Sequence, residues 1–190
     1  MEHPDYVLRA EEAVLVPKKD TEILVKLKPA VWIVIGIIII LSFIFGDNIY
    51  KELSWTARGL LVALAMGTFF VNSDERVPSP FEIWFYGDYL VIYREKHYYS
   101  RKVTRKEYDK FYYKDIKQCQ FRTVTQRINF YGIVEGIWYN YRKDGTLPLE
   151  PTYHKTTDSI RYFYTMYAKN IDFVKEIEAH SPVRVEIQNN

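Results

Sequence analysis

The chain has 190 residues, a formal net charge of +2 and a single cysteine, Cys119. This length allows one modest domain and an anchor. One cysteine excludes an internal disulfide, which fits a reducing compartment, and a charge so close to zero favours no class of partner. The composition does divide the chain into two parts. Most long aliphatic runs lie before Val71, and the sequence after Phe81 is rich in Tyr, Phe, Trp, Lys and Arg.

Residues 1–28 precede the first long apolar run and are expected to form a cytoplasmic segment. Within it, residues 22–27 lie between Pro17 and Pro29. They fit either a strand added to the sheet of a later domain or the start of a membrane helix. The sequence leaves both readings open.

The first predicted membrane helix is residues 30–45, an uncharged run. At about 1.5 Å per residue it measures roughly 24 Å, short of the roughly 30 Å hydrocarbon core of a bilayer. Residues 27–29 can extend the membrane helix, because the long side chains of Lys26 and Lys28 can place their ammonium groups among the lipid headgroups. Lys26, Lys28 and Trp32 are therefore assigned to the membrane interface. A secretory signal is disfavoured, since the run starts about thirty residues in and no A-x-A site directly follows it. A buried core helix is disfavoured because the run is apolar on every face.

The second predicted membrane helix is residues 53–71, where Trp55 and Arg58 mark an interfacial boundary. Small residues recur every fourth position at 59, 63 and 67, which either allows close helix packing or has no special role. The short linker 46–52 predicts antiparallel helices, so residues 29–72 form a transmembrane hairpin. Lys and Arg near the helix ends favour a multi-pass protein of the cell membrane with both termini cytoplasmic.

A polar linker, 73–80, precedes a predicted β domain of residues 81–190. Residues 82–86 and 89–93 flank Gly87-Asp88, a turn suited to a tight hairpin. Further strands are expected at 96–103, 111–116, 118–124, 127–131, 136–142 and 159–167. Residues 147–155 hold two prolines and are expected to form a loop. An amphipathic helix follows, capped by Asn170 and stopped by Ser181-Pro182.

Three segments carry a resemblance to a known family: FEIWFYGDYLVIY at 81–93, YYKDI at 112–116 and the helix at 171–179. Over residues 30–180 the chain resembles the YcxB-like bacterial membrane proteins, which join a two-helix hairpin to a pleckstrin-homology-like domain. The resemblance implies a β-barrel of about seven strands with a C-terminal capping helix, facing the cytoplasm from a bacterial inner membrane. It implies no established activity.

No catalytic or metal-binding constellation emerges from the sequence, so no catalytic residue, metal or cofactor is predicted. The four histidines lack metal-ligand spacing with a carboxylate or cysteine. Cys119 is interpreted as a small buried or half-buried thiol. Glu107, Asp109 and Asp115 lie among lysines and are interpreted as a solvated, charge-mixed surface. An enzyme site assembled from distant residues is the less favoured alternative.

A basic stretch between Arg94 and Lys117 contains nine Lys or Arg and four acidic residues, a difference of +5. Near an anionic leaflet, each basic residue adds about 1 kcal/mol of attraction. The hypothesis is that four of them contact lipid headgroups: Arg101, Lys102, Arg105 and Lys106. A solvated loop whose charges only confer solubility explains the pattern equally well.

The predicted function is therefore a non-enzymatic, membrane-anchored binding or scaffold module. The expected partners are the bilayer, and beyond it anionic lipid, a protein partner or a second copy of the chain. An immunity protein or an accessory subunit of a membrane complex is the alternative. Nucleic acid is disfavoured despite the interleaved tyrosines, because membrane tethering is a poor place for it and many tyrosines alternate as core or cross-strand partners would.

Overall fold

A computed structural model describes residues 3–17, 22–45, 49–70, 74–100, 103–189 of the chain. The chain divides into two compact units. One is a β unit made of residues 1–16 and 76–190, and the other is a helical unit made of residues 17–75. The β domain therefore includes an N-terminal segment that the predicted boundary at residue 81 leaves out.

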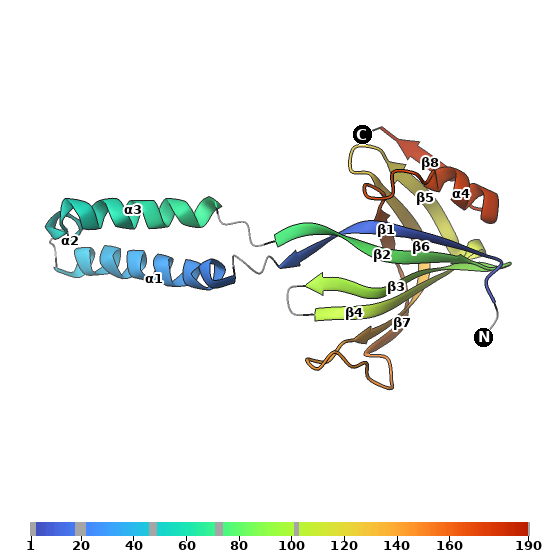
Figure 1. The fold of residues 1–190 in the computed structure, drawn as a ribbon, viewed down its shortest axis with the longest axis horizontal. Coiled ribbons are helices and arrows are strands. Elements are labelled where there is room, and N and C mark those ends of the chain that lie inside the picture. The colour runs from blue at the N-terminus through green and yellow to red at the C-terminus, as the bar shows by residue number, and fades with distance from the viewer. Residues whose placement is uncertain (1–2, 18–21, 46–48, 71–73, 101–102, 190) are drawn as a thin grey trace. The chain divides into compact units, whose positions relative to one another are not determined.

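The β unit is a strongly curved sheet of eight strands with one short helix against it (Figure 1). Its strands are β1 (Tyr6–Pro17), β2 (Asp74–Phe85), β3 (Tyr89–Ser100), β4 (Val103–Tyr112), β5 (Ile116–Arg122), β6 (Arg127–Asn140), β7 (Tyr153–Tyr164) and β8 (Val185–Gln188). A single 3-10 turn, η2 (Tyr113–Asp115), separates β4 from β5, and helix α4 spans Phe173–His180. The sheet order is β1-β2-β3-β4-β6-β5-β8, and β7 pairs with the other edge of β6.

The predicted hairpin at Gly87-Asp88 is confirmed, with Phe85 opposite Leu90 in the β2–β3 ladder. The expected strands at 127–131 and 136–142 are one strand, β6, which pairs first with β5 and then with β4. Residues 74–80 of the predicted linker 73–80 are the first half of β2, and residue 73 lies outside the described residues. Strand β7 begins at Tyr153, inside the expected loop. Propensity alone misses these extensions because tertiary pairing overrides it.

The core is built from phenylalanine and aliphatic residues that alternate along the strands. Six phenylalanines are buried in it: Phe81, Phe85, Phe111, Phe130, Phe163 and Phe173. Helix α4 contributes Phe173 and Ile177 from its apolar face, as the sequence predicts. Its N-cap is Asp172, whose carboxylate accepts from the amide of Lys175, and not the expected Asn170.

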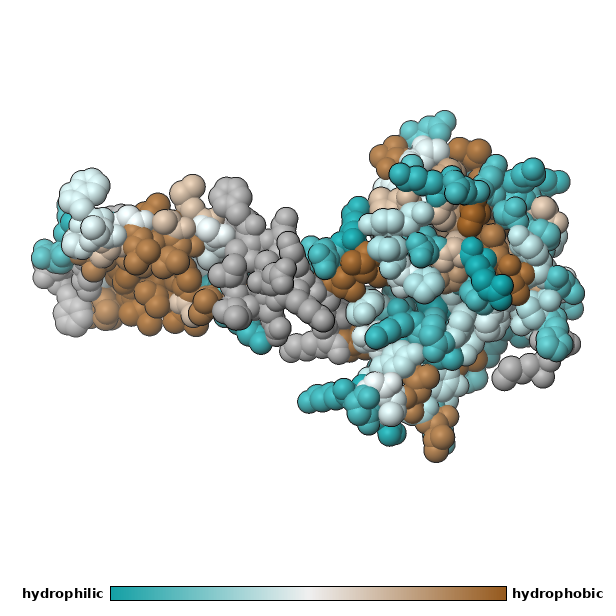
Figure 2. Space-filling model, in the orientation of Figure 1, coloured by the Kyte–Doolittle hydropathy of each residue, from teal (hydrophilic) through white to brown (hydrophobic). Residues whose placement is uncertain are grey.

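The helical unit consists of α1 (Glu22–Phe45), the short α2 (Ile49–Glu52) and α3 (Trp55–Phe70). Residues 22–27 are therefore the start of the first long helix. Helices α1 and α3 run side by side in opposite directions (Figure 1). Hydrophobic residues cover most of the middle of this unit in the view of Figure 2.

Among the described helices, one is long and apolar enough to cross a membrane. It is α1, whose window Val25–Ser42 has a mean hydropathy of 2.1 and no buried residue. Helix α3 has 16 residues and is shorter than this criterion requires. The structure thus supports one candidate membrane span by length and composition, and it does not support the predicted multi-pass chain on that criterion.

Gly132 in β6 occupies a position that only glycine tolerates. Its φ is +151°, and a Cβ there would lie 2.2 Å from the carbonyl oxygen of Asp115. We expect Gly132→Ala to lower the free energy of unfolding by about 1–3 kcal/mol, measured by thermal unfolding of the full chain in detergent. Gly87→Ala is the control, because a Cβ at Gly87 meets nothing within 4 Å. Equal stability of the two variants would contradict the prediction.

Candidate functional site

The concave face of the sheet has an apolar part and a charged part. Along β3, Leu90 and Ile92 point into the phenylalanine core, and Arg94 follows on the same face. Along β4, Phe111 lies in the core, and Asp109 and Glu107 continue its alternation. The charged part is therefore an extension of the core positions and is buried.

Arg94 is the centre of this charged part, with 5% of its side chain exposed. Its Nε donates to Glu12 of β1, and its Nη2 lies 3.3 Å from the second carboxylate oxygen of Glu12. Nη2 also donates to the backbone carbonyl of Tyr162 in β7 at 2.7 Å. Nη1 lies 3.5 Å from Glu107 and 3.9 Å from Asp109. One guanidinium thus connects strands β1, β4 and β7.

The negative charge of Asp109 is also balanced by a second guanidinium group, that of Arg161. Arg161 Nε donates to Asp109 Oδ1 at 2.9 Å, and the indole N–H of Trp138 lies 3.2 Å from the same oxygen. Burial raises the pKa of Asp109, although Arg161 and Arg94 act against this shift. Glycine at position 136 leaves room for the Trp138 ring beside Asp109, because a Cβ at Gly136 would lie 3.2 Å from that ring.

Arg105, near the start of β4, completes the cluster. Its Nε donates to Glu107, and its guanidinium lies 3.9 Å from the ring centroid of Tyr99 and 4.1 Å from that of Trp138. Its side chain is 12% exposed. Three guanidinium groups therefore face three carboxylates, which we call the ionic cluster: Glu12, Arg94, Arg105, Glu107, Asp109 and Arg161.

The ionic cluster is suited to holding strands together and is poorly suited to catalysis. Each carboxylate already has a guanidinium partner and has 4% or less of its side chain exposed, so none of them is accessible to a substrate as a free acid or base. Among the described residues, no group of three or more His, Cys, Asp or Glu could hold a metal ion. Burial raises the pKa of the Cys119 thiol to about 12, which disfavours a nucleophilic thiolate.

His97 borders the ionic cluster, with its Nδ1 3.8 Å from Glu12. Burial and then the positive charge of Arg94 lower the pKa of His97 to about 4. The unfolded chain takes up this proton near pH 6.5, so stability is lost as the pH falls from about 6.5 towards 4. We expect wild type to lose about 2 kcal/mol more than His97→Gln between pH 7.5 and pH 5, measured by denaturant titration. Equal losses would contradict the assignment.

The structure corrects the interpretation of the acidic residues in β4. Glu107 and Asp109 are 2% and 1% exposed and are not part of a solvated surface, whereas Asp115 is half-buried in η2. The sequence interpretation relied on neighbouring lysines and missed the period of two that places 107, 109 and 111 on one face. It also missed Glu12, because β1 was not recognised as a strand of this sheet.

The four predicted headgroup residues have different positions. Arg101 and Lys102 lie outside the described residues. Arg105 belongs to the ionic cluster and points inwards. Lys106 is on the outer face, 3.0 Å from Glu95, with its ammonium near the rings of Tyr93 and Tyr108. The structure does not bring Arg105 and Lys106 together on one free surface.

The five predicted interface residues lie in the helical unit. Lys26 and Lys28 are in the first turns of α1, and Trp32 is 44% exposed farther along the same helix. Trp55 starts α3 with 84% of its surface exposed. Arg58 donates from Nε to the carbonyl of Leu53 at 2.9 Å, so it stabilises the turn before α3.

A groove of about 600 Å³ runs between α1 and α3. Lys28 of α1 and Ala63 and Gly67 of α3 line it, together with aliphatic residues of both helices. Two of the three small residues noted in the sequence therefore face the other helix.

Many tyrosines lie on the outer face of the sheet, and none of the tyrosines whose side chains the structure describes is fully buried. On β2, β3 and β4, the rings of Trp84 and Tyr93 stack with centroids 4.7 Å apart, and Tyr93 lies 5.0 Å from Tyr108. Tyr108 is 6.4 Å from Tyr139 on β6. We call these four residues the aromatic row. These tyrosines are cross-strand partners, as the sequence reading allowed, whereas Tyr6 and Tyr113 are half-buried and pack against the core.

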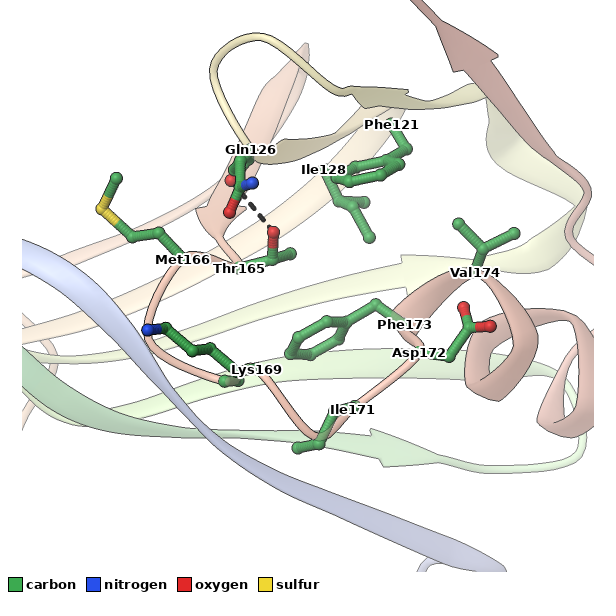
Figure 3. Close-up of a pocket in the computed structure, with 11 residues that line it drawn as sticks. Phe121, Gln126, Ile128, Thr165, Met166, Lys169, Ile171, Asp172, Phe173 and Val174 are labelled. Atoms are coloured by element: carbon green, nitrogen blue, oxygen red, sulfur yellow. Dashed lines mark hydrogen bonds between the residues drawn. The ribbon is translucent and has the colours of Figure 1, made fainter.

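A small groove opens beside the first turn of α4, with a volume of about 290 Å³. Phe121, Ile128 and Phe173 line it from β5, β6 and α4, and Lys169 lies on the preceding loop (Figure 3). Its volume is at the lower limit of the roughly 300–1,000 Å³ usual for ligand pockets. No arrangement of polar groups there indicates a ligand.

Comparison with known proteins finds no family model, no curated protein and no solved structure that matches this chain. The resemblance to YcxB-like proteins stays a prediction from the three sequence segments.

Proposed function

We propose that the chain is a non-enzymatic, membrane-anchored binding module. In this proposal α1 and α3 cross the membrane as a hairpin, and the β unit presents the aromatic row to a protein partner. The observation that carries it is the position of the helical unit, which is inserted between β1 and β2, two neighbouring strands of one sheet.

This insertion requires an even number of membrane crossings. Strand β1 ends at Pro17, before α1 begins at Glu22, and β2 follows α3, so both strands must lie on the same side of the membrane to pair. If α1 crosses, the chain has to return before Asp74, and α3 is the one long apolar helix described in that interval. At about 1.5 Å per residue α3 measures roughly 24 Å, and local thinning of the bilayer can accommodate a span of that length.

The aromatic row supports a protein partner more than a lipid headgroup. Trp and Tyr are the residue types most enriched at the energetic centres of interfaces. The rings are ordered by mutual stacking, so little conformational entropy remains to be lost on binding. Of the basic residues first assigned to headgroups, Arg105 is committed to Glu107, and Lys106 is paired with Glu95.

Site-specific photocrosslinking in cells tests this proposal. A photoreactive amino acid at Tyr108 should give a defined protein adduct, and the same group at Leu149, which is fully exposed in a loop, should not. Adding Trp84→Ala should reduce the Tyr108 adduct at least several-fold. Adducts with lipid alone at Tyr108 would favour headgroup binding and overturn the proposal, and an adduct between two copies of the chain would identify the partner as the protein itself.

A further inference from the structure

A second polar site lies on the outer face of the β5–β6 hairpin. In the ladder, Arg122 is directly opposite Arg127, and Gln120 is directly opposite Asn129. Cys119 and Phe130, one residue along, point into the core, so these four side chains point away from it. Strand β7 adds Tyr162 opposite Asn129 on the same face.

The amides at the centre of this site are buried without partners. Asn129 is 0% exposed, and within the described chain neither its Oδ1 nor its Nδ2 has a hydrogen-bond partner. Gln120 is 6% exposed, and its Oε1 is equally unpartnered in the described structure. Buried polar atoms are nearly always hydrogen-bonded, so three such atoms on one spot indicate an external partner.

The two arginines have the same property. The Nε of Arg122 and that of Arg127 are buried and meet no acceptor among the described residues. Neither guanidinium is within ion-pair distance of a carboxylate in the described ranges, and that of Arg127 packs 4.6 Å from the centroid of Tyr162. The neighbouring Glu186 on β8 accepts instead from Gln118 at 2.6 Å. Like charges directly opposite in a ladder are destabilising, which makes an uncompensated arginine pair costly for the fold alone.

We propose that Arg122 and Arg127, with the amides of Gln120 and Asn129, bind a phosphate monoester. A phosphate dianion matches the two positive charges, and its oxygens can accept from both guanidinium groups and from the Asn129 N–H. The Tyr162 ring holds the Arg127 guanidinium in place. The site is separate from the aromatic row and does not depend on the proposed membrane topology.

Thermal unfolding of the full chain in detergent tests the site, with sodium phosphate replacing sodium chloride at constant ionic strength. At about 100 times its Kd, phosphate should raise the Tm of wild type by roughly 5–10 °C. Arg122→Gln and Arg127→Gln should lose this rise. They should also be at least as stable as wild type without phosphate, because the repulsion is gone. Arg142→Gln, which removes an exposed arginine in the loop after β6, should keep the full rise.

The source of the phosphate is distinguished by two probes, soluble glycerol phosphate and short-chain phosphatidic acid. An arginine-dependent rise with either probe supports the site, and the probe that acts at the lower concentration identifies a soluble metabolite or a lipid headgroup as the source. No rise in wild type overturns the proposal. A rise of equal size in all four proteins also overturns it, because phosphate then acts through general exclusion from the surface.

Discussion

Replacing Arg94 with leucine is expected to lower the free energy of unfolding by about 3–5 kcal/mol, the usual cost of removing one partner of a buried ion pair. The substitution leaves Glu12 without its partner, removes one of the two guanidiniums near Asp109, and leaves the Tyr162 carbonyl without its donor. The corresponding fall in Tm is roughly 6–20 °C. Tryptophan fluorescence in detergent measures it, and Trp138 reports from within the cluster.

Arg9→Leu is the matched control. Arg9 also pairs with a glutamate, at 3.0 Å from Glu82, but its side chain is 76% exposed. Exposed pairs of this kind contribute about 0–1 kcal/mol. If Arg94→Leu were no more costly than Arg9→Leu, the ionic cluster would not hold β1 and β7 to the rest of the sheet.

Cysteine labelling across the membrane is expected to give an all-or-none pattern. If the proposed hairpin crosses the membrane, cysteines at Glu11, before α1, and at Arg142, in the β unit, should react with an impermeant maleimide from the same side only, which the proposal takes to be the cytoplasmic one. A cysteine at Glu52, in α2 between the long helices, should react only from the opposite side. The physical reason is that paired strands β1 and β2 flank the helices and share one compartment.

The native Cys119 provides the internal control, because it is 1% exposed and burial raises the pKa of its thiol to about 12. It should stay unlabelled until the protein is denatured. Labelling of Glu11→Cys and Arg142→Cys from opposite sides would refute the hairpin. Labelling of all three sites from one side would show that the helices do not cross.

Local patterns predicted much of the fold. The Gly87-Asp88 hairpin, the pairing of 118–124 with 127–131 and the apolar face of α4 all follow from turn residues and periodicity, which act over a few residues. The apolar run after Lys28 likewise identified α1, because a continuous apolar surface can be recognised from composition.

The candidate site could not be predicted in the same way. Glu12 and Arg94 are 82 residues apart, and their contact depends on β1 joining the sheet across an inserted helical unit. Glu107 and Asp109 read as surface residues because local composition does not show what faces them. Likewise, Asn129 and Gln120 are ordinary polar residues in the sequence, and only the ladder shows that their amides are buried beside two arginines.

For this chain, the sequence alone determined an apolar anchor segment, a β-rich region with one amphipathic helix, and single hairpins. Each of these depends on residues close together in the chain. Tertiary structure decided the assignment of β1 to the β unit, the burial of the ionic cluster and the outward position of the aromatic row. The physical reason is that a charge or an amide is stable both in water and in a protein interior that supplies partners for it. Those partners come from distant strands, so only the tertiary structure determines whether the group is exposed or buried.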